Sequence, residues 1–245
     1  MDETIDTMDR QEQVYAGKQD RRNFFRLAGL GGAAVALAAC GVDPTRATQV
    51  AQTAATGATG GAATVVGSVT LDFKDDVGVL NYAYALEQLE GAFYAQVLAA
   101  PQFASIFSAA EQRVLTDLRD HEAIHSAFLK AALAGGAIPS LTPNFASIDF
   151  TSRTAVLNAA VAFEDTGVSA YNGAGQYLRN AAYLGLAGKI VSVEARHASA
   201  IHDLLSPRSA SFAPNVLDMG ATPQTVIGIA QQYIVERIIV TNVPA

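Results

Sequence analysis

The sequence contains no tryptophan, a single cysteine, and only 16 lysine and arginine residues among its 245. The missing tryptophan removes a common anchor for sugars and for membrane interfaces. One cysteine cannot form a disulfide within the chain. The 23 acidic residues give a formal net charge of −7, and no Lys/Arg-rich stripe is present to follow a phosphate backbone. We therefore expect no nucleic acid partner. Half of the residues are apolar, which is enough for a sizeable core.

A short apolar run from Leu27 to Ala39 follows the paired arginines Arg21 and Arg22. At thirteen residues it is too short for a permanent membrane-spanning helix, but it suits the core of a signal peptide. The arginine pair, with phenylalanines at 24 and 25, resembles a twin-arginine export signal, although six acidic residues crowd the leader. The resemblance implies an exported protein.

The single cysteine, Cys40, stands in the segment LAACG at the end of this run. That segment resembles a bacterial lipoprotein box. The resemblance implies a diacylglycerol on the sulfur of Cys40, attachment to a membrane through this lipid, and a location in the periplasm or at the cell surface. Two alternatives stay open: an ordinary buried cysteine, or cleavage at the small-x-small site formed by residues 36–38.

The chain divides into three predicted parts. Residues 1–39 form the signal peptide, and residues 40–71 form the lipid attachment site with a flexible tether. Residues 41–70 are rich in alanine, threonine and glycine, with one acidic and one basic residue. Such a segment has too little apolar surface to offset the entropy of ordering it. Residues 72–245 form the folded domain, with its core at 75–205.

From residue 72 onward the apolar residues recur at spacings of three and four, which predicts helices. Ser108 and Glu111 have the spacing of a capping box, and Thr222-Pro223 has the pattern of a helix start. We expect an all-α fold of four long helices with a long crossover, residues 135–150, between the second and third. The predicted helices span about 75–100, 109–134, 152–178 and 181–205, with an additional C-terminal helix at about 223–240.

Two copies of Glu-x-x-His occur in the second and fourth predicted helices, Glu122 to His125 and Glu194 to His197. Residues three apart on a helix lie on one face, one turn along, so that a carboxylate and an imidazole can converge on one metal ion. One copy alone is weak support, because Glu and His at this spacing often form a solvated surface pair. Two copies on separate helices are more informative.

The first and third predicted helices each carry a glutamate followed seven residues later by a tyrosine: Glu87 with Tyr94, and Glu164 with Tyr171. Seven residues are close to two helical turns, so each tyrosine lies on the face of its glutamate. The chain therefore consists of two related halves, each with Glu-x6-Tyr on one helix and Glu-x-x-His on the next.

With these motifs, residues 75–205 resemble the ferritin-like superfamily, and in particular exported bacterial proteins with one ferritin-like domain. The resemblance implies a ferritin-like four-helix bundle that holds two iron or manganese ions. It also implies that Tyr94 and Tyr171 lie near the metals and take part in the chemistry. The alternative for both tyrosines is packing in the core with a satisfied hydroxyl. The ligands carried over by motif are Glu87, Glu122, His125, Glu164, Glu194 and His197.

Charge supports such a site, because four carboxylates buried together repel one another and raise one another's pKa values. Two divalent cations balance the four negative charges. Glu90, one turn from Glu87, is the rival ligand on the first helix, but Gly167 stands at the matching position of the third. His121 and His202 are expected on the surface, away from the centre.

We interpret the domain as a redox protein of the cell envelope. In this interpretation O2 or peroxide is reduced at the dimetal centre while Fe2+ or another small reductant is oxidised. One alternative is peroxide dismutation of the manganese-catalase type. Another is a non-catalytic structural or stress-related protein that keeps only the fold. The metal, the reductant and the oligomeric state stay open.

Overall fold

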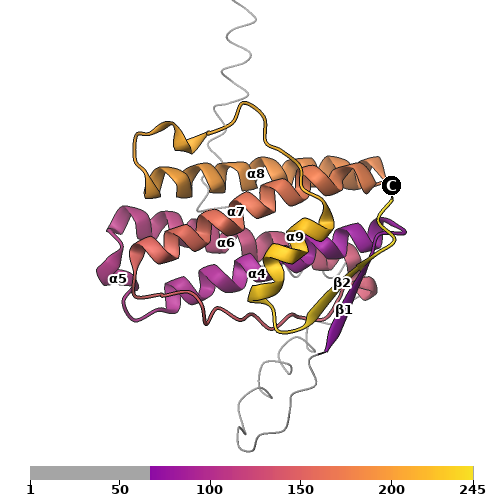
Figure 1. The fold of residues 1–245 in the computed structure, drawn as a ribbon, viewed down its shortest axis with the longest axis horizontal. Helices are drawn as coiled ribbons and strands as arrows, with labels where there is room; N and C mark the ends of the chain where they lie inside the picture. Colours follow the sequence, from indigo (N-terminus) through magenta and orange to yellow (C-terminus); the bar gives the residue numbers. More distant parts are fainter. Residues whose placement is uncertain (1–66, 245) are drawn as a thin grey trace, which may run out of the picture. The chain divides into compact units, whose positions relative to one another are not determined.

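The computed structural model describes residues 67–244. Four long helices form the body of this part of the chain, two shorter helices accompany them, and two strands pair at one edge (Figure 1). The helices and strands are α4 (Asp76–Ala99), α5 (Phe103–Ile106), α6 (Ala109–Leu133), α7 (Arg153–Ala174), α8 (Ala181–Leu205), α9 (Pro223–Ala230), β1 (Ser68–Asp72) and β2 (Arg237–Thr241). Short 3-10 helices occupy Ala134–Gly136, Gly175–Tyr177, Ala210–Phe212 and Gln231–Tyr233.

The long helices begin where local side chains satisfy their first free N–H groups. Ser108 and Glu111 form a complete capping box at the start of α6, in which the Ser108 N–H donates to Oε2 of Glu111 at 2.7 Å. The side chains of Asp75, Ser152 and Asn180 cap α4, α7 and α8. The predicted bounds of the four long helices therefore agree closely with the structure, except that α7 changes to a 3-10 turn after residue 174.

The helices pack as two antiparallel pairs, α4 with α6 and α7 with α8, and a long link at 137–152 joins the pairs. This arrangement confirms the predicted bundle with its crossover between the second and third long helices. Helix α4 is buried on nearly every side from residue 78 to 90. Side chains at the centre of the bundle are consequently far from bulk water, and Glu87 on α4 is one of them.

The two strands correct two of our predictions. Residues 68–71, expected in the flexible tether, belong to β1, and the C-terminal helix ends at residue 230, not near 240. Residues 237–241 instead form β2, which runs parallel to β1 and pairs Val69 with Ile238 and Leu71 with Val240. The β-branched residues of β2 favour a strand. Their partner lies at the other end of the domain, so helical spacing alone could not reveal it.

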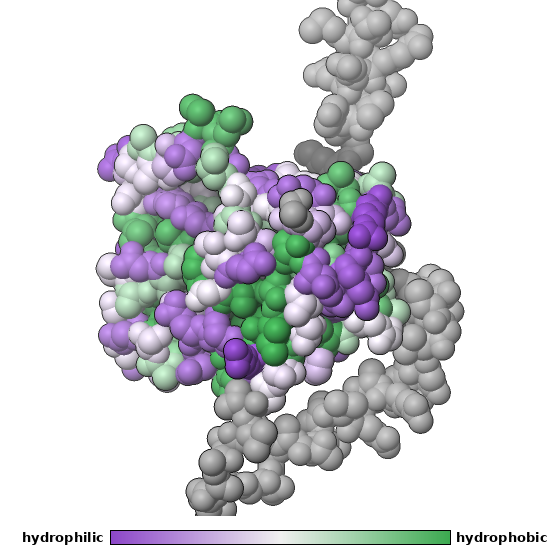
Figure 2. Space-filling view, turned by 45° about the vertical axis from the view of Figure 1, so that its right-hand side comes forward, coloured by the Kyte–Doolittle hydropathy of each residue, from purple (hydrophilic) through white to green (hydrophobic). Residues whose placement is uncertain are grey.

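The link between α8 and α9, residues 206–222, carries the most exposed large apolar side chains of the described residues, including Val216 and Leu217. Figure 2 shows one face of the molecule, on which hydrophobic residues lie among hydrophilic ones. The link is attached to α7 through the Ala221 N–H, which donates to the Ser169 carbonyl at 2.9 Å. A Cβ at Gly173 would lie 1.9 Å from the Ala221 carbonyl oxygen, so this approach requires glycine.

The export motif, Cys40 and the tether up to residue 66 lie outside the described residues. Among residues 67–244, no helix combines the length and the hydropathy that crossing a membrane requires.

Candidate metal centre

Six side chains from the four long helices meet in the middle of the bundle. Helices α4 and α7 each contribute one glutamate, and α6 and α8 each contribute a glutamate and a histidine. The four glutamates are fully buried, the side chain of His197 is 4 % exposed and that of His125 is 12 % exposed. The structure thus brings together all six residues that the motifs predicted: Glu87, Glu122, His125, Glu164, Glu194 and His197.

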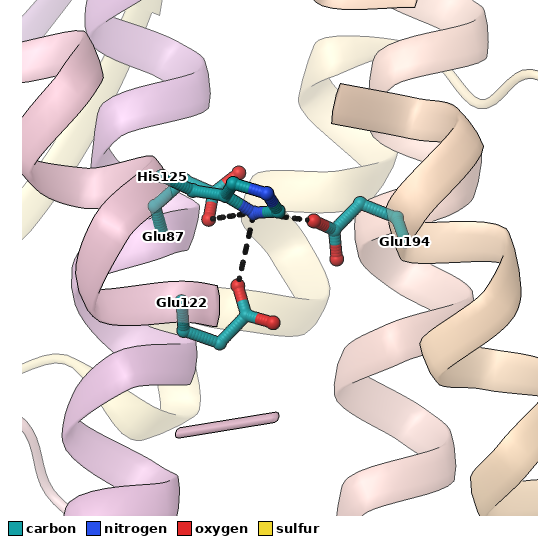
Figure 3. A group of neighbouring side chains, drawn as sticks. All are labelled: Glu87, Glu122, His125 and Glu194. Atoms are coloured by element: carbon teal, nitrogen blue, oxygen red, sulfur yellow. Dashed lines mark ion pairs between the residues drawn. The ribbon is translucent and has the colours of Figure 1, made fainter. Parts of the chain in front are cut away.

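The first group of ligand atoms surrounds Nδ1 of His125 (Figure 3). This nitrogen lies 2.8 Å from Oε1 of Glu194, 3.4 Å from Oε2 of Glu87 and 3.6 Å from Oε2 of Glu122. Glu87, Glu122 and His125 belong to one helix pair, whereas Glu194 reaches across from the other pair. All four ligand atoms of this group lie within 4.8 Å of one another.

The second group surrounds Nδ1 of His197 in the same manner. This nitrogen lies 2.7 Å from Oε1 of Glu122, 3.5 Å from Oε2 of Glu164 and 3.5 Å from Oε2 of Glu194. Its four ligand atoms also lie within 4.8 Å of one another. The two halves of the sequence therefore produce two matching groups.

Glu122 and Glu194 belong to both groups. Oε2 of Glu122 faces His125 and its Oε1 faces His197, while Oε1 of Glu194 faces His125 and its Oε2 faces His197. Glu87 belongs only to the first group and Glu164 only to the second. Two neighbouring ions held here would share Glu122 and Glu194, and each would have one further glutamate and one histidine.

The donor atoms themselves indicate that a cation fits here. Among the described residues, Nδ1 of both histidines, both oxygens of Glu122 and Glu194, and Oε2 of Glu87 and of Glu164 are buried without a hydrogen-bond partner. Buried polar atoms without partners are costly and rare in folded proteins. Carboxylate oxygens and imidazole nitrogens are the donors that iron and manganese take in proteins. Two divalent ions would satisfy these atoms and balance the four carboxylates.

A family model for the ferritin-like domain matches residues 75–207, which include all six side chains. The chain belongs to the ferritin-like domain family. No curated protein sequence matches the chain.

When no metal is bound to the ferritin-like domain, protons on the histidines and on some of the glutamates offset the negative charge of the centre. Burial alone would lower the pKa of His125 and His197, but the surrounding carboxylates outweigh it and raise both to about 12. Burial raises the pKa of Glu164 to about 8 and that of Glu87 well above its usual range. Burial also acts on Glu122, but the neighbouring histidines outweigh it and lower its pKa to about 2. Metal ions must therefore displace protons when they bind.

The two tyrosines of the repeat cross between the helix pairs of the ferritin-like domain. Tyr171 on α7 donates its hydroxyl hydrogen to Oε1 of Glu87 on α4, at 2.5 Å. Tyr94 on α4 donates to Oε1 of Glu164 on α7. Each of these glutamates thus keeps Oε2 for its group of ligand atoms while a tyrosine from the other half fixes Oε1. The tyrosines thus orient Glu87 and Glu164, the two glutamates that each belong to only one group of ligand atoms.

His121 corrects our expectation of a surface residue. It is half-buried, and its Nδ1 lies 2.8 Å from Nε2 of His197, with the two rings stacked at 5.1 Å between centroids. Burial and then the neighbouring His197 lower the pKa of His121, which favours a neutral ring that accepts a hydrogen bond. If Nδ1 of His197 held a metal ion, Nε2 would carry the ring hydrogen and would donate it to Nδ1 of His121. His121 therefore orients one histidine of the site.

The sequence did contain a signal for this contact. His121 stands four residues before His125, on the same helical face, although it is 100° away from Glu122. The matching position in the second half, four residues before His197, is Val193. His125 and His197, the two histidines of the ligand groups, therefore do not have equivalent surroundings. His202, by contrast, lies off the centre, with its Nε2 3.0 Å from Oδ1 of Asp165.

Glu90, the rival ligand, belongs to neither group of ligand atoms. It is nonetheless 3 % exposed, and burial raises its pKa well above the usual range. Its carboxylate fills the space beside Gly167, where a Cβ would lie 2.8 Å from Oε1 of Glu90. Gly167 on α7 corresponds in position to Glu90 on α4. Because it has no side chain, it leaves the space that the Glu90 carboxylate fills.

Proposed function

We propose that this ferritin-like domain binds two iron ions between its four glutamates and two histidines and oxidises Fe2+ with dioxygen or peroxide. The observation that carries the proposal is the sharing of Glu122 and Glu194 by both groups of ligand atoms. Carboxylates that reach both positions hold two ions close enough to act on one small molecule. A site for a single ion would not require glutamates whose two oxygens face different histidines.

Two Fe2+ ions held by these residues would supply one electron each to O2, and with two protons the products would be H2O2 and two Fe3+ ions. The protein contributes position and charge. Glu87 and Glu164 each bind with one oxygen and accept a tyrosine hydrogen bond with the other, which restrains their movement as the charge of the ions changes. Burial of all four carboxylates limits the access of water.

Anaerobic titration of the metal-free protein with Fe2+, followed by metal analysis, tests this proposal. We expect about two ions per chain and, on addition of O2, an absorbance change from ferric ions with O2 consumed. Retention of fewer than about one ion per chain after reconstitution would rule the proposal out. Oxygen evolution from peroxide with manganese but not with iron would instead assign the manganese-catalase-type activity.

We further propose that the domain works in the cell envelope, held by a lipid on Cys40. The support is the resemblance of the N-terminal sequence to a twin-arginine signal and a lipoprotein box. Mass spectrometry of the mature protein tests it: we expect an N-terminal residue 40 carrying a diacylglycerol. An unmodified Cys40, or a mature chain that begins beyond it, would contradict this location.

A further inference from the structure

The bundle contains a cavity of about 30 Å3, partly open to the surface, at the end where α4 begins and α6 ends. All four long helices contribute to its wall. The lining residues are valine, leucine, isoleucine, alanine, glycine, phenylalanine and tyrosine, without a charged or amide side chain. The cavity is therefore apolar and separate in chemistry from the carboxylate centre.

The cavity nevertheless adjoins the centre. Tyr171 forms part of its wall and also donates its hydroxyl hydrogen to Glu87. Leu86, the residue before Glu87, and Ile190, one turn before Glu194, also line it. On the outer side the wall includes Phe128, which is 41 % exposed. The lining thus extends from the surface of α6 to Tyr171, which contacts Glu87 of the first group.

Size and polarity limit what the cavity can hold. A cavity needs about 10–15 Å3 on this scale to hold one water molecule, so 30 Å3 accommodates a molecule of two or three atoms. The Tyr82 hydroxyl, buried without a partner among the described residues, is one group that a water molecule could bond here. Water needs two to four such partners, and apolar cavities that lack them stay dry and take up apolar molecules or noble gases. Hydrogen peroxide would lose hydrogen bonds on entering, as water does. Dioxygen loses none.

We infer that this cavity binds dioxygen beside the Glu87–His125 position of the dimetal centre. The inference rests on the proposed function, and it selects dioxygen over peroxide as the oxidant. Tyr171 stands between the cavity and the ligand atoms, with its ring on the apolar side and its hydroxyl on Glu87. Dioxygen is apolar, and so is the cavity wall. The cavity therefore raises the local concentration of dioxygen beside the centre without a hydrogen bond.

The first experiment measures gas binding without any reaction. Metal-free protein with 13C-labelled methyl groups is placed under xenon, and methyl shifts are followed by NMR. We expect saturable changes at Leu86 and Ile190, which line the cavity, and their loss in Ala83→Leu, which fills it. Ala182→Leu, at an exposed position of α8 outside the lining, is the control and should keep them. Absence of a saturable change in the wild-type protein would overturn the inference.

The second experiment measures the oxidant. In Ala83→Leu, the O2 concentration for half-maximal Fe2+ oxidation should rise several-fold, while the rate with hydrogen peroxide and the number of bound ions match those of Ala182→Leu. Because a larger residue in a core can prevent folding, Ala187→Leu fills the cavity from the opposite helix as a second variant. Equal slowing with both oxidants, or an unchanged O2 dependence in a folded variant, would contradict the inference.

The two proposals fail in different ways. If the wild-type protein neither retains two ions nor consumes O2, the proposed function is wrong, whatever xenon does. If the wild-type protein consumes O2 but xenon does not bind and the filled variants behave as the control, the proposed function stands and the cavity is a packing defect.

Discussion

The hydroxyl of Tyr171 lies 2.5 Å from Oε1 of Glu87, although the two residues belong to different helix pairs and different halves of the sequence repeat. The reciprocal contact joins Tyr94 to Glu164. These two bonds tie the halves together directly at the metal centre. Removing one tyrosine hydroxyl leaves a buried carboxylate oxygen without its donor. This costs more free energy than replacing both partners of a hydrogen bond by apolar groups.

Tyr171→Phe should therefore lower the free energy of unfolding by about 1–3 kcal/mol and weaken binding of the ion beside Glu87. Urea unfolding of the metal-free protein and metal titration measure the two effects. Tyr84→Phe on α4 is a matched control, because no hydrogen bond joins the Tyr84 hydroxyl to the described residues; its effect should stay within about 0.5 kcal/mol. Equal effects of the two substitutions would show that the contact with Glu87 contributes nothing.

The shared carboxylates should affect metal content differently from the unshared ones. Glu122→Gln removes a charge that faces both histidines, so we expect the variant to lose both ions. Glu87→Gln removes a ligand of one group only and should leave about one ion per chain. Metal analysis after reconstitution gives the counts. Two ions retained by Glu122→Gln would contradict the bridging geometry.

His121→Val copies into the first half the residue found at the matching position of the second, Val193. Without its hydrogen-bond partner, His197 is held less firmly, so its ion should be released to a chelator about 10- to 100-fold faster. The other ion should leave at the wild-type rate, which makes the release biphasic. His202→Val, away from the centre, serves as control. A single unchanged rate in His121→Val would remove the orienting role of His121.

Stability of the metal-free protein should fall as the pH rises from about 5 to about 8.5. Folding raises the pKa of Glu164 from 4.5 to about 8 and that of His125 and His197 from 6.5 to about 12. Groups with raised pKa values stabilise the fold fully below their unfolded pKa and lose this contribution as the pH rises through the folded one. Glu122, with its pKa lowered from 4.5 to about 2, loses its contribution only as the pH falls through that value.

Thermal unfolding of the metal-free protein across this range measures the effect. Glu164→Gln should make the fall in stability between about pH 5 and 8 less steep, because it removes one of the buried carboxylates whose pKa folding raises; Glu87 and Glu90 remain. Affinity for divalent metal should change in the opposite sense and increase with pH, since fewer protons remain to be displaced. A melting temperature of the metal-free protein that rises steadily toward pH 8 would contradict the assignment.

Gly167→Ala should destabilise the protein even though alanine favours a helix by about 1 kcal/mol over glycine. The new Cβ would lie 2.8 Å from Oε1 of Glu90, so this buried carboxylate would have to shift from its place. Adding Glu90→Ala should remove the clash and restore or exceed wild-type stability, as a double-mutant cycle by urea unfolding can measure. Additive effects of the two substitutions would show that they do not interact.

Local features of the sequence predicted most of the bundle, because caps and apolar spacing act within a few residues. Ser108 and Glu111 are one such signal, and α6 begins where they place it. The pairing of β1 with β2 joins the two ends of the domain, so no local pattern encodes it. For this reason residues 68–71 were expected in the tether, and the C-terminal helix was expected to continue to about 240.

At the centre, helical spacing predicted which face each residue occupies but not what that face meets. The six expected ligands lie together, and their binding of metal stays a prediction. Spacing placed Tyr94 on the face of Glu87, whereas its hydroxyl contacts Glu164 on another helix. The 100° angle between His121 and Glu122 predicts a surface position for His121, but its partner, His197, belongs to α8 and is not visible from spacing within α6.

The crossed tyrosines make each half of the domain an incomplete site. A single helical hairpin carrying Glu87, Tyr94, Glu122 and His125 holds one set of ligands but lacks the second bridging carboxylate and the tyrosine that fixes Glu87. Two copies of such a hairpin, related by a twofold axis, would supply each other with both. The present chain therefore has the internal symmetry of a dimer of hairpins joined covalently by one long link. The two halves differ at two matching positions beside the centre, where His121 corresponds to Val193 and Glu90 corresponds to Gly167.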